Sequence, residues 1–406
     1  MFRVRSGLAV FASVAALLTV APEGAPAAAS GGARAAPAAR PAWAERIDRL
    51  IGRRSFGVAV REGNRYLYRH QEKRQRIPAS NEKLMLSMAV MGTLGPETRL
   101  VTQAASAAPV AGVVPGDLWI LGQGDPAVDS RRMENLAAAI RAAGVVRVEG
   151  SVLGSTGFFK RDWRAPGWKS YFPREHIPLP TALTYEGNTA GGTHIRDPEA
   201  RAAKALSRSL RDLGIRIGGK PGAARAPQGL LPIAQVESRP IADLLEFTNR
   251  YSSNFYAEVL GKRLGVEHAG APGTITKGAQ AIQAWAGERG VGVRSRDSSG
   301  LSYANRVSPS GLVRLLGAAE LEVWGEDLRE SLPRPGQGTL SGRMKHLKVH
   351  AKTGTLTGIS SLSGWVFLRH ERVWAEFSIL SRGVTKDQAM RIEDAIVRIL
   401  ARSARV

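Results

Sequence analysis

A serine and a lysine lie three residues apart, at Ser80 and Lys83, within RIPASNEKLMLSMAVMGTLG, residues 76–95. Apolar residues at helical spacing follow, so we expect a helix that begins near Ser80, with Ser80 or Asn81 as its N-cap. Residues three apart lie on the same face of a helix. A serine hydroxyl becomes a nucleophile when a base takes its proton, and Lys83 can be that base. The alternative is a helix cap beside a surface lysine.

A second motif, Ser252, Ser253 and Asn254, directly follows a predicted helix over 241–250. A hydroxyl at Ser252 can relay a proton to a leaving amine. The amide of Asn254 can hold both Lys83 and a peptide carbonyl of a substrate. The alternative is that these residues only separate two helices.

A third motif, Lys352, Thr353, Gly354 and Thr355, lies on a predicted strand near the C-terminus. A cation and two hydroxyls on an edge strand can bind the terminal carboxylate of a substrate. Gly354 is expected to leave room for the substrate backbone to approach the strand. The alternative is a solvated strand end before a turn.

The three motifs support one reaction if the fold brings them together. A second ammonium at Lys352 would lower the pKa of Lys83, so that Lys83 could act as a neutral base. The backbone N–H groups of Ser80 and Thr355 are the predicted oxyanion hole. Each motif by itself is common in long chains, and their order along this chain is what makes the combination specific.

The elements around these motifs predict an α+β core. A helix is expected over 43–51, and strands over 55–61 and 65–70 form a predicted hairpin. Three strand-like runs, 348–354, 360–368 and 372–381, precede a closing helix over 386–402. We therefore expect an antiparallel sheet flanked by helices from both ends of the chain.

Residues 101–236, between the first and second motifs, are predicted to form an inserted α/β domain. Short strand-like pieces lie at 116–122 and 147–154, and helices are expected over 133–143 and 198–213. The catalytic domain is then built from 44–100 and 237–406. The inserted stretch contains no pair of residues that is obviously reactive.

The N-terminus has the pattern of a secretory signal. Arg3 and Arg5 precede a short apolar run, and small residues follow it, so we expect a signal peptide over 1–29 with cleavage after Ala29, or else after Ala27. Residues 30–43 read as a flexible linker rich in Ala, Pro and Gly. The mature protein is predicted to be secreted across the inner membrane and to lie in the periplasm, with no transmembrane anchor.

The 406-residue chain has a formal net charge of +22, which indicates an acidic partner. Basic residues are scattered and no basic run is flanked by aromatic residues, so nucleic acid is not expected. The basic surface instead allows peripheral association with a membrane or with an acidic wall polymer. No cysteine is present, so the mature fold has no disulfide and depends on its core.

No cofactor and no metal are predicted. His346 and His350 lie four apart with no acidic ligand nearby, and on a strand such residues are too far apart to share an ion. Gly122, Gln123 and Gly124 lack the third glycine and the βαβ context of a dinucleotide-binding loop.

The three motifs together make the chain resemble the low-molecular-mass class C penicillin-binding proteins of the penicillin-binding protein 4 type, which are D-alanyl-D-alanine carboxypeptidases and endopeptidases. Further stretches resemble this family, among them GDLWILGQGDP, ALTYEGN and DSSGLSYANRVSP. The resemblance covers roughly residues 44–400. Ser253 stands where aspartate is frequent in this family, and the insertion is short, so one inserted domain is expected.

The resemblance implies a β-lactamase/transpeptidase-like core, in which Ser80 forms an acyl-enzyme with peptidoglycan stem peptides and crosslinks. It also implies that β-lactams bind at the same site. Two alternatives remain. One is a β-lactamase, although no clear deacylation glutamate is found. The other is a non-catalytic, wall-binding scaffold on the same fold, which would have no need of the full set of reactive residues.

Overall fold

The computed structural model describes residues 40–107 and 112–404. The predicted signal peptide and residues 30–39 of the predicted linker lie outside the described residues. The first helix, α1 (Ala42–Ile51), already begins within the end of that linker. In the described ranges, no helix is both long and apolar enough to cross a membrane.

The first sheet joins the two ends of the described chain. It has five strands in the order β13-β14-β15-β1-β2, and all neighbouring strands are antiparallel. The strands are β1 (Ser55–Glu62), β2 (Arg65–His70), β13 (Val349–Leu356), β14 (Ile359–Leu368) and β15 (Val373–Arg382). The predicted N-terminal hairpin is therefore present, and β1 continues the sheet formed by the last three strands.

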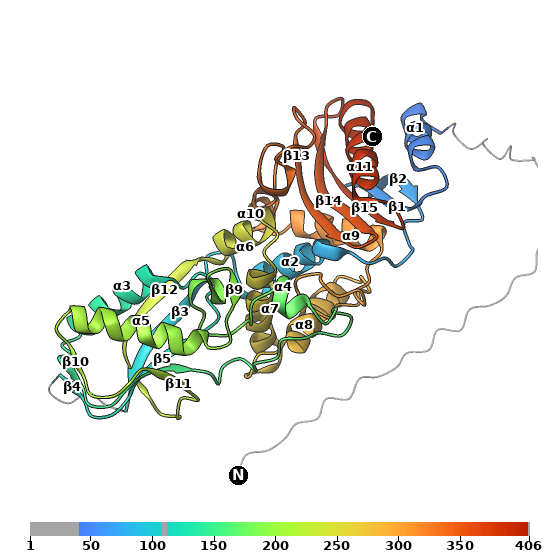
Figure 1. Ribbon diagram of the computed structural model, residues 1–406. Coiled ribbons are helices and arrows are strands. Elements are labelled where there is room, and N and C mark those ends of the chain that lie inside the picture. The colour runs from blue at the N-terminus through green and yellow to red at the C-terminus, as the bar shows by residue number, and fades with distance from the viewer. Residues whose placement is uncertain (1–39, 108–111, 405–406) are drawn as a thin grey trace, which may run out of the picture. The chain divides into compact units, whose positions relative to one another are not determined.

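The two faces of this sheet pack against different helices, because side chains alternate along a strand. On β14, Ser360 Oγ donates a hydrogen bond to Glu393 of α11 (Lys386–Ser403). The next residue, Ser361, donates from Oγ to Pro78 O on the opposite face, just before Ser80. α1 and α11 cover the first of these faces (Figure 1), so the closing helix lies behind the sheet that carries the third motif.

The other face is covered by a helical layer. α2 (Glu82–Leu94) is buried along most of its length, which suits a helix with apolar residues on nearly every side. Its neighbours in the same hydrophobic core are α6 (Ile241–Arg250), α7 (Asn254–Ala269), α8 (Ile275–Glu288), α9 (Pro309–Glu320) and α10 (Gly325–Ser331). Trp365 and Leu380 of the sheet belong to this core too.

A second five-stranded sheet is formed entirely by residues between the first and second motifs. Its order is β11-β7-β5-β3-β12. The strands are β3 (Arg99–Ser106), β5 (Leu118–Gly122), β7 (Val152–Ser155), β11 (Gly222–Ala224) and β12 (Leu231–Pro240). β3 and β12 pair antiparallel, so the chain enters and leaves this part side by side. The domain limits given above stay a prediction.

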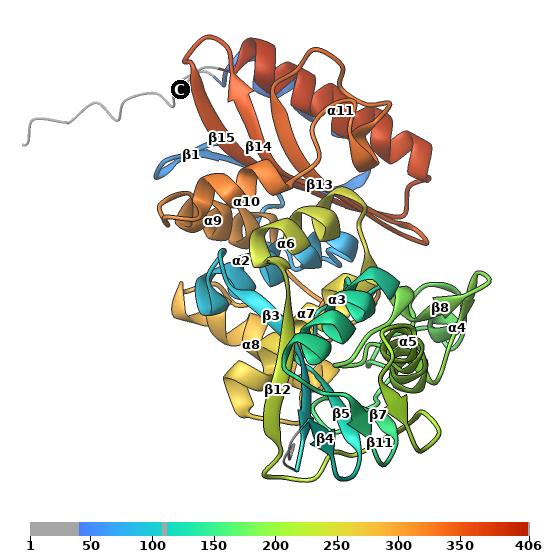
Figure 2. The same cartoon turned by 90° about the vertical axis from the view of Figure 1, so that its left-hand side faces the viewer.

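Helices α3 (Ser130–Ala142) and α5 (Pro198–Asp212) pack with this sheet around a separate hydrophobic core (Figure 2). A small parallel sheet joins β4 (Val113–Val114), β6 (Arg147–Val148) and β10 (Arg216–Ile217). The remaining short elements are η1 (Ala79–Asn81), α4 (Phe172–Glu175), η2 (Glu186–Asn188), β8 (Thr189–Ala190), β9 (Thr193–His194) and η3 (Gly338–Leu340).

A buried ion pair fixes the closing helix to the segment between η3 and β13. Arg343 donates to Glu393 at 2.9 Å and to Asp394 at 2.7 Å, and the side chain of Glu393 is fully buried. Replacing Arg343→Met would leave this carboxylate without its cation. We expect the free energy of unfolding to fall by about 3–5 kcal/mol, as for other broken buried pairs, when measured by urea denaturation.

A matched control is Arg334→Met, which removes an exposed ion pair with Glu330 one turn away. Such pairs contribute at most about 1 kcal/mol. Equal losses for the two variants would contradict the buried role of Arg343.

Candidate active site

The chain reaches Ser80 through a single turn of 3-10 helix, η1, and only then enters α2. Asn81 occupies the N-cap position of α2, as predicted, but its side chain makes no capping hydrogen bond. Asn81 instead joins the helix to the sheet: its Nδ2 donates to Lys352 O at 2.7 Å, and its Oδ1 accepts from Ser363 Oγ at 2.8 Å. These bonds hold Ser80 beside β13.

Lys83 is fully buried, which excludes the alternative of a surface lysine. Its ammonium donates to Ser80 Oγ at 3.2 Å and to Asn254 Oδ1 at 2.9 Å. A third bond goes to the backbone oxygen of Ser299. The predicted pairing of the first two motifs around Lys83 is therefore present in the structure.

Lys352 joins the third motif to the second. Its ammonium is buried and donates to Ser252 Oγ and to Thr353 O, each at 2.9 Å. Ser252 has a φ of +54°, in the left-handed region where a residue other than glycine is strained. Ser253 accepts from Tyr256 N and so caps α7, which explains why this side chain is not directed at Lys83 or Lys352.

Gly354 packs closely against the turn that carries Ser80. A Cβ at this position would lie 2.8 Å from Ser80 N and 2.2 Å from Ser361 Oγ. Ser361 Oγ and the backbone of Pro78 and Ser80 occupy the space beside Gly354, so the glycine lets η1 approach β13. Thr353 is half-buried and Thr355 is exposed, and neither hydroxyl has a hydrogen-bond partner among the described residues.

Burial controls the protonation of both lysines. It lowers the pKa of Lys83 to about 8, while the carboxyls of Asp297, Glu258 and Glu82 act in the opposite direction. Burial also brings the pKa of Lys352 well below its usual value, and the charge of Lys83 lowers it further. The pKa of Lys83 is therefore lowered, as predicted, but the cause is burial. Repulsion between the two ammonium groups instead lowers the pKa of Lys352.

A buried acidic cluster, consisting of Glu82, Glu258 and Asp297, lies around Lys83 and was not predicted. Burial raises the pKa of Glu82 well above its usual value, and Glu82 accepts a hydrogen bond from Ser295 Oγ. Burial likewise raises the pKa of Glu258 to about 8. Glu258 follows Asn254 by one helical turn on α7, which is the only signal in the sequence that could have indicated it.

The loop that contains Asp297 lines the site and also has a structural role. Asp297 accepts from the backbone N–H groups of Gly300 and Ser302 and from Asn305 Nδ2. Gly300 has a φ of +85°, and a Cβ there would lie 2.0 Å from Ala79 O. The loop thus packs directly against the turn that carries Ser80.

The stretch between the first and second motifs also reaches the site. Asn254 Nδ2 donates to His176 O at 3.1 Å, just after α4, and Trp168 Nε1 donates to Asp297 at 2.6 Å. The sequence had indicated nothing reactive in this part. Asn188, in contrast, is buried and bonds to Leu179 O, which is a packing role.

The described residues contain no group of three His, Cys, Asp or Glu side chains that could hold a metal ion. His350, one of the two histidines considered for a metal, has its Nδ1 at 3.0 Å from Arg329 O.

Comparison with known proteins shows the family of the chain. A model of the D-Ala-D-Ala carboxypeptidase 3 (S13) family matches residues 46–190 and 177–403. The chain belongs to this family.

Relatives of similar length support the assignment. The chain is 27% identical over 432 residues to a D-alanyl-D-alanine carboxypeptidase from an Actinomadura species, covering 83% of this chain and 79% of that protein. It is 28% identical over 360 residues to a carboxypeptidase DacB from Mycolicibacterium smegmatis, covering 80% of this chain and 75% of the relative.

The fold agrees with solved structures. Penicillin binding protein 4 from Haemophilus influenzae superposes with a TM-score of 0.77 at 20% identity, covering 88% of this chain and 99% of that one. The predicted α+β fold, with an antiparallel sheet flanked by helices, is confirmed.

The protonation of Lys83 predicts a pH dependence. A lysine that takes the proton of Ser80 must be neutral, and the pKa of Lys83 is lowered to about 8. We therefore expect the single-turnover cleavage rate of a D-alanyl-D-alanine peptide to rise with pH and to level off above about 8. Rapid-quench measurements across this range test it. A rate that falls through the same range would contradict a neutral Lys83 as the base.

Proposed function

We propose that this protein is a serine-type D-alanyl-D-alanine carboxypeptidase and endopeptidase that forms an acyl-enzyme at Ser80. The observation that carries the proposal is the buried ammonium of Lys83, which lies 3.2 Å from Ser80 Oγ and 2.9 Å from Asn254 Oδ1. Family membership supports the class of reaction, since the matching family consists of D-Ala-D-Ala carboxypeptidases.

Acylation begins when neutral Lys83 takes the proton of Ser80. Ser80 Oγ then bonds to the carbonyl carbon between two D-alanines, or between D-alanine and a diamino acid in a crosslink. The N–H groups of Ser80 and Thr355 would stabilise the oxyanion. The C–N bond breaks, and the leaving amine receives its proton through Ser252, which Lys352 contacts at 2.9 Å.

Deacylation reverses the same steps with water. The water oxygen bonds to the acyl carbon, the bond to Ser80 Oγ breaks, and a proton returns to Ser80. Carboxypeptidase and endopeptidase reactions share this chemistry, and they differ only in the group beyond the bond that is cut. Asn254 would hold both Lys83 and a substrate carbonyl, as its contact with Lys83 allows.

The substrate's terminal carboxylate would bind to Lys352, Thr353 and Thr355. Lys352 has a pKa well below its usual value in the site as it stands. An incoming carboxylate favours the charged form of a neighbouring amine, so Lys352 would take up a proton as the substrate binds. Gly354 lies between the two threonines and keeps β13 against Ser80.

β-Lactams are proposed to acylate the same serine. The structure of penicillin binding protein 4 from Haemophilus influenzae complexed with a β-lactam also superposes on this chain, with a TM-score of 0.73. The alternative of a β-lactamase requires rapid release of the opened drug. A non-catalytic scaffold is the other alternative, and it offers no reason to bury two lysines beside a serine.

The location and the domain limits remain part of the proposal. A signal peptide over 1–29 would bring the chain across the inner membrane to the periplasm, followed by a linker over 30–43. The catalytic domain would consist of 44–100 and 237–406, with 101–236 inserted. Peptidoglycan peptides are the proposed substrates, and the net charge of +22 favours association with acidic surfaces of the wall or the membrane.

Intact-protein mass after brief exposure to benzylpenicillin tests the proposal. We expect the wild-type protein to gain one drug mass and Ser80→Ala to gain none, because the variant lacks the hydroxyl that lies beside Lys83. Ser253→Ala is the control, since this serine caps α7 and should leave the adduct intact.

Two other outcomes are informative. An unmodified wild-type protein with intact drug would overturn the enzyme proposal and favour the scaffold. An unmodified protein with consumed drug would indicate a β-lactamase.

A further inference from the structure

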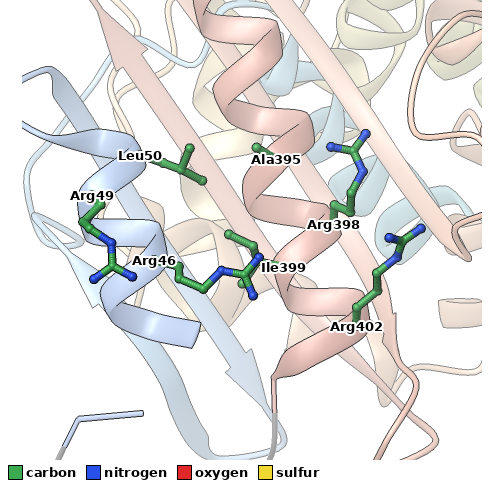
Figure 3. Close-up of a pocket in the computed structure, with 7 residues that line it drawn as sticks. All are labelled: Arg46, Arg49, Leu50, Ala395, Arg398, Ile399 and Arg402. Atoms are coloured by element: carbon green, nitrogen blue, oxygen red, sulfur yellow. The ribbon is translucent and has the colours of Figure 1, made fainter. Parts of the chain in front are cut away.

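A groove of about 530 Å³ lies between α1 and α11. We call it the α1–α11 groove. Figure 3 shows that arginines from both helices line it, together with the partly buried Leu50 and the core residue Ile399. Arg46 and Arg49 come from α1, and Arg398 and Arg402 come from α11. Residues three or four apart share a helix face, which explains why each helix presents two arginines to the groove.

The positive charge of this groove is poorly compensated. Arg49 has one weak contact, 3.8 Å from Glu45. In the part of the chain that the structure describes, the guanidinium groups of Arg46, Arg398 and Arg402 have no hydrogen bond or ion pair. All three are exposed. Like charges gathered without counter-ions repel one another, so a bound anion would stabilise this arrangement.

The groove lies on the face of the first sheet opposite to Ser80. Ser361 and Ser363 of β14 point to Pro78 and Asn81 beside the active site. Ser360 comes directly before Ser361, so its side chain is on the opposite face, where it donates a hydrogen bond to Glu393 of α11. A surface bound at the groove would therefore leave the catalytic face of the sheet open to substrates.

We propose that the α1–α11 groove binds the phosphate groups of anionic phospholipids and so holds the protein at a membrane surface. Guanidinium groups form paired hydrogen bonds with phosphate, and each basic residue at an anionic membrane strengthens binding. The partly buried side chain of Leu50 adds apolar surface to the groove, which favours a lipid over a fully hydrophilic wall polymer. α11 itself does not insert, because its apolar side packs on the sheet.

Co-sedimentation with vesicles tests the proposal without using the peptidase reaction. The probes are vesicles of phosphatidylcholine alone and of phosphatidylcholine mixed with phosphatidylglycerol. We expect binding only to the anionic vesicles. The triple variant Arg46→Gln, Arg398→Gln, Arg402→Gln should bind about 100-fold more weakly, from the usual contribution of each basic residue.

The matched control replaces three exposed arginines between the first and second motifs with glutamine: Arg131, Arg211 and Arg216. It removes the same charge and should keep the wild-type affinity. Equal loss in both triple variants would overturn the proposal in favour of general attraction to net charge. Binding of the wild type to isolated wall material but not to anionic vesicles would overturn it in favour of a wall polymer.

A second inference concerns Glu258, and it rests on the proposed function. Glu258 Oε1 accepts from Ser298 N at 2.9 Å and from Ser299 N at 2.7 Å. The carbonyl of Ser299 in turn accepts from Lys83 Nζ. Glu258 Oε2 is buried without a partner in the described part of the chain. The carboxyl thus fixes the backbone that holds the proposed base.

Charged and titratable groups face Glu258 from each side. Glu82 and Lys83 come from α2, Asp297 comes from the loop, and Lys262 lies one turn further along α7. We infer that Glu258 is a positioning residue, which aims Ser299 O at Lys83 and adjusts the proton affinity of this lysine. Its ionised form favours the ammonium form of Lys83, as the charges of Asp297 and Glu82 do.

Glu258→Gln and Glu258→Ala separate these two effects. The glutamine can still accept both backbone N–H groups but carries no charge. The rate of acylation by benzylpenicillin is expected to rise with pH and then level off. We expect Glu258→Gln to reach the same maximal rate as the wild type, with the rising part of this pH profile moved to lower pH. Glu258→Ala loses the support of the loop, and its plateau should fall about tenfold or more. Glu267→Gln, at an exposed site on the same helix, should match the wild type.

An NMR titration of the Lys83 side chain keeps this test separate from the proposed function. A lower pKa of Lys83 in Glu258→Gln supports the inference even if no acyl-enzyme forms. If the pKa of Lys83 and the pH profile of the acylation rate are both unchanged in Glu258→Gln, the inference is overturned. If Glu258→Ala fails to fold, the pKa of Lys83 in Glu258→Gln, compared with that in the wild type, still tests the inference.

Discussion

The burial of one ammonium group, that of Lys83, is the constraint on which the rest of the site depends. A buried charge is costly unless it is paired or hydrogen-bonded. Lys83 therefore needs its acceptors, and each comes from a different segment: Ser80, Asn254 and Ser299. The same bonds that satisfy the lysine bring the nucleophile, the start of α7 and a glycine-containing loop to one place.

The sheet supports this arrangement from one side. Asn81 bonds to β13 and β14, and Gly354 allows η1 to lie against the strand. The buried faces of the sheet then separate two functions in space. One face carries the proposed acylation site, and the other carries α1, α11 and the arginines of their groove.

The stretch between the first and second motifs contributes more than a separate core. The second five-stranded sheet of the protein packs with α3 and α5. The irregular segment around α4 returns to the site, where His176 O accepts a hydrogen bond from Asn254 and Trp168 donates one to Asp297. The candidate site is therefore built from both parts. Such contacts join segments far apart in the sequence, and no local pattern of residue types marks them.

The sequence by itself predicted the candidate catalytic residues and most of the elements. Spacing and residue type are local properties, and they identified Ser80 with Lys83, the three final strands and the closing helix. Only the tertiary structure decided the tasks of Asn81, Gly354 and Glu258, because each depends on which distant backbone lies beside it. The same holds for protonation: the pKa of Lys83 follows from its burial, and burial is a property of the packed chain as a whole.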